Sequence, residues 1–216
     1  MKKFTRALYI PFDHLHRQYG VLKSADADSD LIVMVESQSM ITGDTWHPER
    51  LFFLISSARH FAEVLRAEGF EVRYLKSRNT VAGLQEIKSE FPEIAFIAAE
   101  QSSYRLTQSL TEFGVNFIEN DFFLTPRTLF ASWAASQKSY LMENFYRKQR
   151  VRLNVLMEGA SPIGGQWNYD KDNRLPPPKN YTWPAYLEHE RDEIDLEVAA
   201  EIAMAPTKTW ATTRQG

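Results

Sequence analysis

The sequence predicts an α/β protein with a Rossmann-like open parallel sheet of five strands, helices on both faces of that sheet, and a helical and loop-rich C-terminal extension. Short apolar runs alternate with segments of helical spacing through residues 7–119. The runs contain few polar residues, which is typical of strands buried on both faces of a parallel sheet. This alternation favours a sheet covered by helices over a sandwich or a bundle.

Two apolar runs, Ala7–Ile10 and Leu31–Val35, are predicted as the first two strands. The helix predicted next, over residues 48–67, has the clearest signal in the chain. Its apolar residues recur at helical spacing, Pro48 suits a first helical turn, and Gly69 suits the position just after a helix.

The remaining elements of the sheet follow in the same alternation. Strands are predicted at 71–75, 94–98 and 115–119, and helices at 81–91 and 104–113. Pro92 and Gly114 come directly after the two helices, and both residue types commonly end helices.

Beyond the last strand the pattern changes. Two successive helices are predicted over 126–135 and 138–157, packed beside the sheet as an extension of the same domain. Proline and glycine are frequent from Glu158 onward, so this stretch indicates a connector, with one more helix over 194–203. We therefore expect an α/β domain over 1–157, an extended aromatic and proline-rich connector over 158–203, and an unstructured tail over 204–216.

Composition excludes several classes of chemistry. Hydrophobic residues make up 44% and charged residues 25% of the 216 residues, as in a folded globular protein. The chain has no cysteine, which excludes disulfides, thiolate nucleophiles, and cysteine-ligated zinc or iron–sulfur clusters. A net charge of −3 provides no overall positive field for nucleic acid or anionic lipid. The apolar run at 7–12 is too short for a signal sequence or a membrane span, so a cytoplasmic protein without a membrane partner is expected.

Ligands of open parallel sheets bind outside the carboxyl ends of the strands. The candidate segments here are 12–14, 36–38, 100–103 and 119–121. Carboxylates such as Asp13, Glu36 and Glu100 could accept hydrogen bonds from the ring N–H or ribityl hydroxyls of a nucleotide-like or flavin-like ligand. The alternative is that these side chains cap the helices that follow.

Several familiar motifs are absent. No G-x-G-x-x-G follows the first strand and no P-loop occurs, which disfavours dinucleotide binding and phosphoryl transfer. His14 and His16 would point to opposite faces of an extended segment, so no metal site is expected, and His60 is interpreted as a packing histidine. No nucleophile–base pair stands out, so no catalytic residue is predicted.

A basic segment with interleaved aromatic residues lies at 138–152. Arg147, Lys148 and Arg150 could contact DNA phosphates or a partner chain, although the acidic net charge favours a solvated helix face instead. Trp167, in a glycine-flanked loop, needs a surface to cover it. Either it docks on its own domain or it marks a contact with another one.

Two motifs carry a resemblance to a known family. Met142–Arg147, with the sequence Met-Glu-Asn-Phe-Tyr-Arg, and the Gly-Gly-Gln-Trp-Asn-Tyr-Asp segment at 164–170, followed by Asn173 and Arg174, resemble the bacterial photolyase-related proteins. These are the iron–sulfur (6-4) photolyases and prokaryotic cryptochromes. Further similarity lies at Ser57–Ala62, and the resemblance extends over about residues 6–200.

The resemblance implies an N-terminal antenna domain that holds a light-harvesting chromophore, 6,7-dimethyl-8-ribityllumazine or a flavin. In the family a connector then leads to a helical domain with FAD and a four-cysteine iron–sulfur cluster. This chain resembles only the antenna and connector. The resemblance therefore implies that this chain has neither an FAD site nor an iron–sulfur cluster. It also implies that the chain alone neither repairs nor binds DNA. The tail does not resemble the family's continuation, which leaves a truncated chain, a frame-shifted one and a free-standing paralogue as alternatives.

The implied chromophore site lies near the ends of the first two strands. Asp13 and Glu36 match the family, and Leu54 keeps an apolar wall, whereas Met40 stands where lumazine-binding relatives have a carboxylate. Trp46 and Arg50 would supply a stacking plane and a charge. The full set of candidate residues is Phe12, Asp13, His14, Glu36, Ser37, Met40, Trp46, Arg50, Leu54 and Glu100.

Two functions follow as hypotheses. The first is an antenna-like module of a deoxyribodipyrimidine photolyase-related or cryptochrome-like protein, which binds such a chromophore. The second is a non-catalytic interaction module in which residues 138–173 contact DNA or a partner, for instance a helical FAD-binding domain. A hydrolase or transferase is a weaker third option, because an α/β fold alone does not decide function.

Overall fold

The computed structural model describes residues 4–43, 46–170, 176–185, 187 and 189–204. These residues form two compact units. The first, termed the sheet unit, contains the chain up to Leu124 together with the segment from Glu190 onward, and the second, termed the α6 unit, spans Thr125–His189. The tail predicted over 204–216 lies, apart from Met204, outside the described residues, as do Asn173 and Arg174. The domain boundaries expected from the sequence stay a prediction.

The sheet unit contains a five-stranded parallel sheet with the strand order β3-β2-β1-β4-β5. The strands are β1 (Arg6–Tyr9), β2 (Asp30–Ser37), β3 (Glu71–Ser77), β4 (Ala95–Ala99) and β5 (Asn116–Ile118). This confirms the predicted open parallel sheet. Strand order reverses between β1 and β4, which is the place where a doubly wound sheet opens a crevice for ligands.

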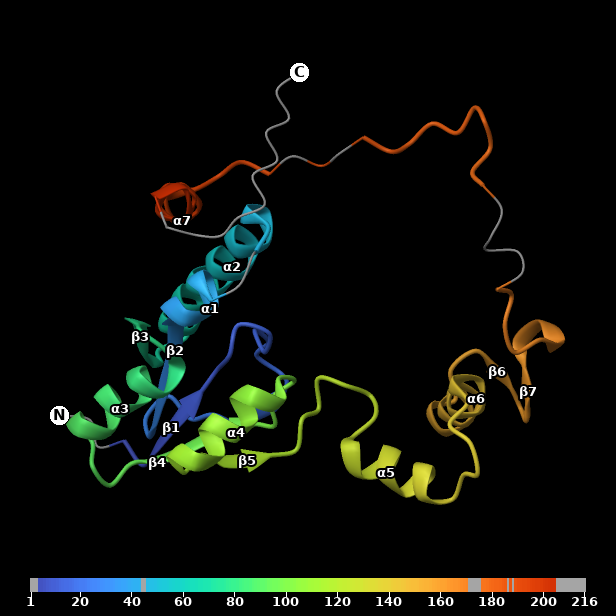
Figure 1. Ribbon diagram of the computed structural model, residues 1–216, viewed down its shortest axis with the longest axis horizontal. Coiled ribbons are helices and arrows are strands. Elements are labelled where there is room, and N and C mark those ends of the chain that lie inside the picture. The colour runs from blue at the N-terminus through green and yellow to red at the C-terminus, as the bar shows by residue number, and fades with distance from the viewer. Residues whose placement is uncertain (1–3, 44–45, 171–175, 186, 188, 205–216) are drawn as a thin grey trace. The chain divides into compact units, whose positions relative to one another are not determined.

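Helices cover both faces of this sheet (Figure 1). They are α1 (Gln38–Thr42), α2 (Pro48–Ala67), α3 (Thr80–Glu90), α4 (Tyr104–Phe113) and α7 (Glu193–Met204). On one face, Leu84 of α3 and Leu110 of α4 pack with Val33 of β2. On the other face, Ala62 of α2 packs with Ile32 of β2. The bounds of α2 and α4 agree with the prediction, because caps and breakers flank both helices.

Helix α7 lies against α2 (Figure 1), so the chain returns to the sheet unit after the α6 unit. Val198 and Ile202 of α7 are buried with Leu51 and Ile55 of α2. The helix predicted over 194–203 is thereby confirmed. Its docking on α2 was not foreseen, because the sequence pattern does not say which surface a short apolar helix covers.

The α6 unit contains α5 (Arg127–Ala135), α6 (Met142–Leu153), and a small hairpin of β6 (Met157–Glu158) and β7 (Ser161–Pro162). Trp133 is buried, and its ring lies 4.7 Å from that of Phe145. The predicted helix 138–157 was too long at both ends. Asn154 adopts a left-handed conformation (φ 52°) and its backbone N–H closes the last turn, so the helix ends there.

No helix among the described residues combines the length and the apolar composition needed to cross a membrane.

Candidate functional site

A cleft of about 1150 Å³ opens at the carboxyl end of the sheet. Its walls come from the ends of β1 and β2, from α1, from the first half of α2, and from α3 and α4. This is the edge where ligands of open α/β sheets bind. Residues lining it include Tyr9, Phe12, Asp13, Val35, Ser37, Met40, Trp46, Arg50, Leu54, Arg78, Thr80, Glu86 and Arg105.

An aromatic surface forms part of the cleft wall. The indole N–H of Trp46 donates to the carbonyl oxygen of Met40 at 2.7 Å, which fixes the plane of the ring. The guanidinium of Arg50 lies 4.5 Å from the centre of that ring, within cation–π range. Phe12 stacks on Tyr74 with the ring centres 6.1 Å apart. The lining therefore combines aromatic rings with a charged group, as ligand sites commonly do.

Polar groups of two kinds line the cleft. Burial raises the pKa of the Tyr9 phenol, so this group stays neutral and can donate a hydrogen bond. Asp13 is exposed at the rim and accepts hydrogen bonds only. Ser37 caps α1, since its hydroxyl oxygen accepts from the backbone N–H of Met40 at 3.3 Å. Ser37 therefore both caps α1 and lines the cleft.

Most of the predicted binding residues line this cleft. They are Phe12, Asp13, Ser37, Met40, Trp46, Arg50 and Leu54. The other three predicted residues, His14, Glu36 and Glu100, are not among its lining residues.

Glu36 is buried in an ion pair with Arg59, 3.1 Å away, and also accepts from the Tyr74 hydroxyl at 2.8 Å. Its neighbours Val35 and Ser37 line the cleft instead. Successive side chains of a strand point to opposite faces, so Glu36 cannot share the face of Ser37. The sequence placed Glu36 at the right strand end but not on the face that borders the cleft.

His14 is 4% exposed and stacks on Phe122 with the ring centres 4.4 Å apart. Burial lowers the pKa of His14, which favours the neutral imidazole, and its Nε2 lies 3.3 Å from the Asn120 amide nitrogen. The same amide donates to the backbone carbonyl of Glu100 at 2.7 Å. These contacts tie the end of β1 to the ends of β4 and β5 beside the cleft.

Two arginines of the cleft were missed by the sequence reasoning. Arg78 follows β3, and Arg105 lies in the first turn of α4. The apolar run of β3 ends at Leu75, two residues before the strand does, so the segment after Ser77 was left out of the candidate strand ends. Applying the same rule to the end of β3 would have found Arg78.

The predicted partner contacts lie in the α6 unit. Arg147 is about half exposed, and Lys148 is exposed. Arg150 is 6% exposed and donates to the backbone carbonyls of Trp167 (3.0 Å), Val155 (3.3 Å) and Leu156. Arg150 therefore holds this unit together and offers little to a partner.

Trp167 docks on its own unit. The guanidinium groups of Arg147 and Arg150 lie 5.3 and 5.4 Å from the centre of its ring. Both arginines belong to α6, so Trp167 is covered by its own unit, which was one of the two alternatives for this loop. Whether the exposed residues of the unit contact DNA or a partner stays a prediction.

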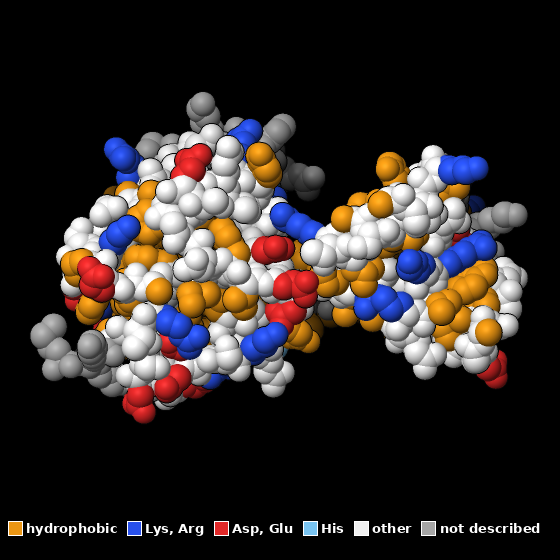
Figure 2. Space-filling model, turned by 90° about the horizontal axis from the view of Figure 1, so that it is seen from below, with side chains coloured by type: hydrophobic (Ala, Val, Ile, Leu, Met, Phe, Trp, Pro, Cys, Tyr) orange, Lys and Arg blue, Asp and Glu red, His pale blue; other side chains and the backbone are white. Residues whose placement is uncertain are grey.

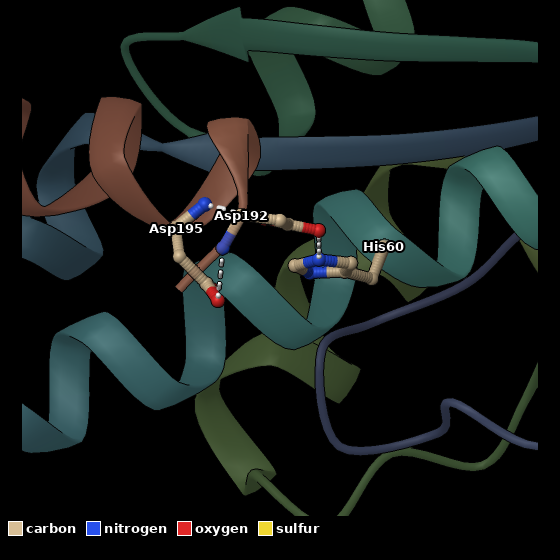
Figure 3. A group of neighbouring side chains, drawn as sticks. All are labelled: His60, Asp192 and Asp195. Atoms are coloured by element: carbon tan, nitrogen blue, oxygen red, sulfur yellow. Dashed lines mark hydrogen bonds and ion pairs between the residues drawn. The ribbon is translucent and has the colours of Figure 1, made fainter. Parts of the chain in front are cut away.

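His60, Asp192 and Asp195 form the one group of described residues close enough to hold a metal ion, with their ligand atoms within 4.8 Å of one another (Figure 3). Hydrogen bonds among these three side chains and the neighbouring backbone explain why they lie close together. Asp192 and Asp195 each accept from the other's backbone N–H, which caps the start of α7. The Nε2 of His60 lies 2.7 Å from the Asp192 carboxylate, and its Nδ1 lies 2.8 Å from the Ser56 carbonyl oxygen.

Comparison with known proteins gives three matches. A family model described as "Deoxyribodipyrimidine photo-lyase-related protein" matches residues 8–215. A (6-4) photolyase of Agrobacterium fabrum is 32% identical over 198 residues, which make up 86% of this chain and 39% of that protein. An uncharacterized protein of Acanthamoeba polyphaga mimivirus is 23% identical over 165 residues, 69% of this chain and 84% of the viral protein. The chain thus spans about two fifths of the length of the photolyase.

Proposed function

The chain belongs to the deoxyribodipyrimidine photo-lyase-related protein family, and from this premise we propose that its sheet unit binds an aromatic light-absorbing chromophore of the lumazine or flavin class. Membership agrees with the resemblance of the Met142–Arg147 and 164–170 motifs, and the chain fits an N-terminal domain of this family. The observation that carries the proposal is the cleft at the carboxyl end of the sheet.

The lining of this cleft suits a flat heterocycle with polar edges. Trp46 offers a ring face, Leu54 an apolar contact, and Phe12 a second aromatic side chain. Asp13 would accept from a ring N–H or a ribityl hydroxyl, and the neutral Tyr9 would donate to a ring carbonyl. A volume of about 1150 Å³ leaves room for a two- or three-ring system with its side chain.

In binding of this kind the protein positions the chromophore and adjusts its absorption, and it breaks no bonds. The photolyase activity in the name of the Agrobacterium relative belongs to a protein of which this chain matches 39%. We therefore propose for this chain the chromophore-holding role only. Repair chemistry would need a further, FAD-binding domain in the same chain or in a partner.

Titration of the purified protein with 6,7-dimethyl-8-ribityllumazine and with riboflavin tests the proposal. Saturable binding at micromolar concentration, with a shifted absorption band and quenched tryptophan fluorescence, is expected. Leu54→Trp should block it by filling the cleft. Val64→Trp, at a half-exposed position of the same helix that does not line the cleft, is the matched control. Failure of the unaltered protein to bind either compound would reject the proposal.

A second candidate function, an interaction module, is favoured by the surface of the α6 unit. Val151 of α6 is 57% exposed and lies near the exposed Lys148 in the helix. Figure 2 shows hydrophobic side chains beside Lys and Arg side chains on this unit, the right-hand body in that view. We propose a helical domain of the family's photolyases as the partner, because apolar side chains rimmed by charge are common in protein interfaces.

A pull-down tests this second candidate, with the part of the Agrobacterium photolyase that this chain does not match as bait. We expect retention of the chain, and loss of retention in Val151→Asp but not in Val64→Asp. Equal retention of both variants would contradict the proposal. A gel shift with duplex DNA at low salt separates the DNA alternative, since phosphate contacts are strongest there.

A further inference from the structure

We propose that the cleft takes its chromophore as a phosphate monoester, with the phosphate held by Arg78 and Arg105. The inference rests on the proposed function and adds the chemical class of the ligand's side chain. A lumazine or riboflavin carries an uncharged ribityl chain, whereas the phosphorylated form ends in a group with up to two negative charges.

The first argument is the pairing of arginines within the sheet unit. Five of them form ion pairs with carboxylates: Arg6, Arg17, Arg59, Arg66 and Arg73. By contrast, no carboxylate among the described residues lies within ion-pair distance of Arg50, Arg78 or Arg105, and all three line the cleft. Arg191, which packs on the ring of Phe52, is the one other described arginine of this unit without such a partner.

The second argument is placement. Arg78 lies between β3 and Asn79, the N-cap of α3, and Arg105 is the second residue of α4. Both helices pack on the same face of the sheet, side by side (Figure 1), and both arginines line the cleft where these helices begin. Trp46, between α1 and α2, and Leu54 of α2 line the same cleft. The cleft therefore offers a ring-binding surface and two cationic side chains to one ligand.

The third argument is that the backbone at both arginines is fixed. The Arg78 carbonyl oxygen accepts from the backbone N–H of Ser39 at 2.9 Å, which ties the end of β3 to α1. Asn79 caps α3, with its side-chain oxygen 2.8 Å from the Ala82 nitrogen, and Ser103 caps α4 in the same way at 3.3 Å. Since these side chains occupy the helix N-termini, an anion here would be bound chiefly by the guanidinium groups.

Helix α3 is also held close to the sheet. A Cβ at Gly83 would lie 2.8 Å from a methyl carbon of Val35, so glycine allows α3 to approach β2. Val35 itself lines the cleft. This close approach sets the position of the first turn of α3, and with it that of Arg78.

Guanidinium groups bind phosphate through paired, charge-assisted hydrogen bonds, and two unpaired guanidiniums suit a doubly charged oxyanion. Two carboxylates, Asp13 and Glu86, also line the cleft, and neither forms an ion pair with these arginines in the described part of the chain. Glu86 instead accepts from the Ser77 hydroxyl at 3.1 Å. An uncharged ribityl chain would leave both arginines without a counter-charge.

Riboflavin and its 5′-phosphate, FMN, differ only in the phosphate and make the decisive pair of probes. We expect FMN to bind the unaltered protein about tenfold or more tightly than riboflavin, because a charged hydrogen-bonded contact is worth about this factor. The advantage should shrink as salt is raised, since both arginines are exposed to solvent. It should disappear in the double variant Arg78→Gln, Arg105→Gln. Lys88→Gln, in the last turn of α3 at a position that does not line the cleft, should keep it.

The outcomes separate the two levels of the proposal. Equal affinity for FMN and riboflavin, or an unchanged preference in the double variant, would overturn the phosphate site and leave chromophore binding intact. Binding of neither compound, and of no lumazine, would overturn both. Inorganic phosphate should compete with FMN and leave riboflavin binding unaffected. If phosphate displaces neither compound while FMN keeps its advantage, the FMN phosphate is held by contacts that inorganic phosphate does not make, and the site at Arg78 and Arg105 is rejected.

Discussion

The guanidinium of Arg59 and the carboxylate of Glu36 lie 3.1 Å apart and are both almost fully buried, at 9% and 5% side-chain exposure. Arg59 also pairs with Glu197 and Glu201 of α7. One buried arginine therefore links the end of β2 to the helix that returns from the far part of the chain. Glu36, which the sequence suggested as a chromophore ligand, instead supports the helix packing behind the cleft.

Replacing Glu36 by glutamine should destabilise the fold and leave the cleft intact. It removes the buried partner of Arg59, and we expect a loss of about 2–4 kcal/mol in the free energy of unfolding. Urea denaturation of the purified protein measures it. Glu63→Gln breaks an exposed ion pair with Arg66 and should cost under about 0.5 kcal/mol. Weaker chromophore binding by folded Glu36→Gln would show that Glu36 contacts the ligand after all.

Trp46→Leu should weaken chromophore binding about tenfold, because it removes the ring face and the cation–π partner of Arg50. Fluorescence or absorption titration gives the dissociation constant. Trp183→Leu, at a 69% exposed position of the α6 unit, is the matched control. Equal affinity of both variants would place the chromophore away from Trp46.

The contact between His60 and Asp192 predicts a pH dependence. The hydrogen bond to Asp192 and that to the Ser56 carbonyl raise the pKa of His60 above its ordinary value of about 6.5. The contribution of this contact to stability is therefore complete below about pH 6.5 and is lost as the pH rises through the raised pKa. The hydrogen-exchange protection factors of the α7 amides, which correct for the intrinsic rise of exchange with pH, should fall over that range in the unaltered protein. In His60→Gln this change should be absent, and an identical pH profile in both proteins would contradict the assignment.

Ile202→Ala should loosen α7 from α2. Ile202 is 9% exposed and packs with Leu51 and Ile55, and the truncation should cost about 2–3 kcal/mol. Faster proteolysis within α7 is the expected readout, since local opening precedes cleavage. Leu196→Ala, at a 58% exposed position of the same helix, should leave the proteolysis rate unchanged.

The sequence predicted the sheet and most of the cleft because simple periodic rules govern both. Pro48 and Gly69 bracket a strongly patterned α2, and the residues after β1 and β2 include most of the predicted lining. The features that the sequence did not predict depend on the geometry of single residues. The alternation of side chains along β2 removed Glu36 from the cleft, and the left-handed conformation of Asn154 ended α6 early. Tertiary choices, such as the docking of α7 on α2, have no local signal.

The packing of α7 on α2 should hold the C-terminal segment in place after proteolytic cleavage of the chain. The sheet unit receives the chain again at Glu190, so residues 125–189 form an excursion that is anchored at both ends. A protease that nicks the backbone within 176–185 would leave Val198, Ile202 and the carboxylates around Arg59 in their places. The two fragments would then migrate together in gel filtration and separate only in denaturant. A cleaved protein would in this way keep its C-terminal helix as a non-covalent subunit.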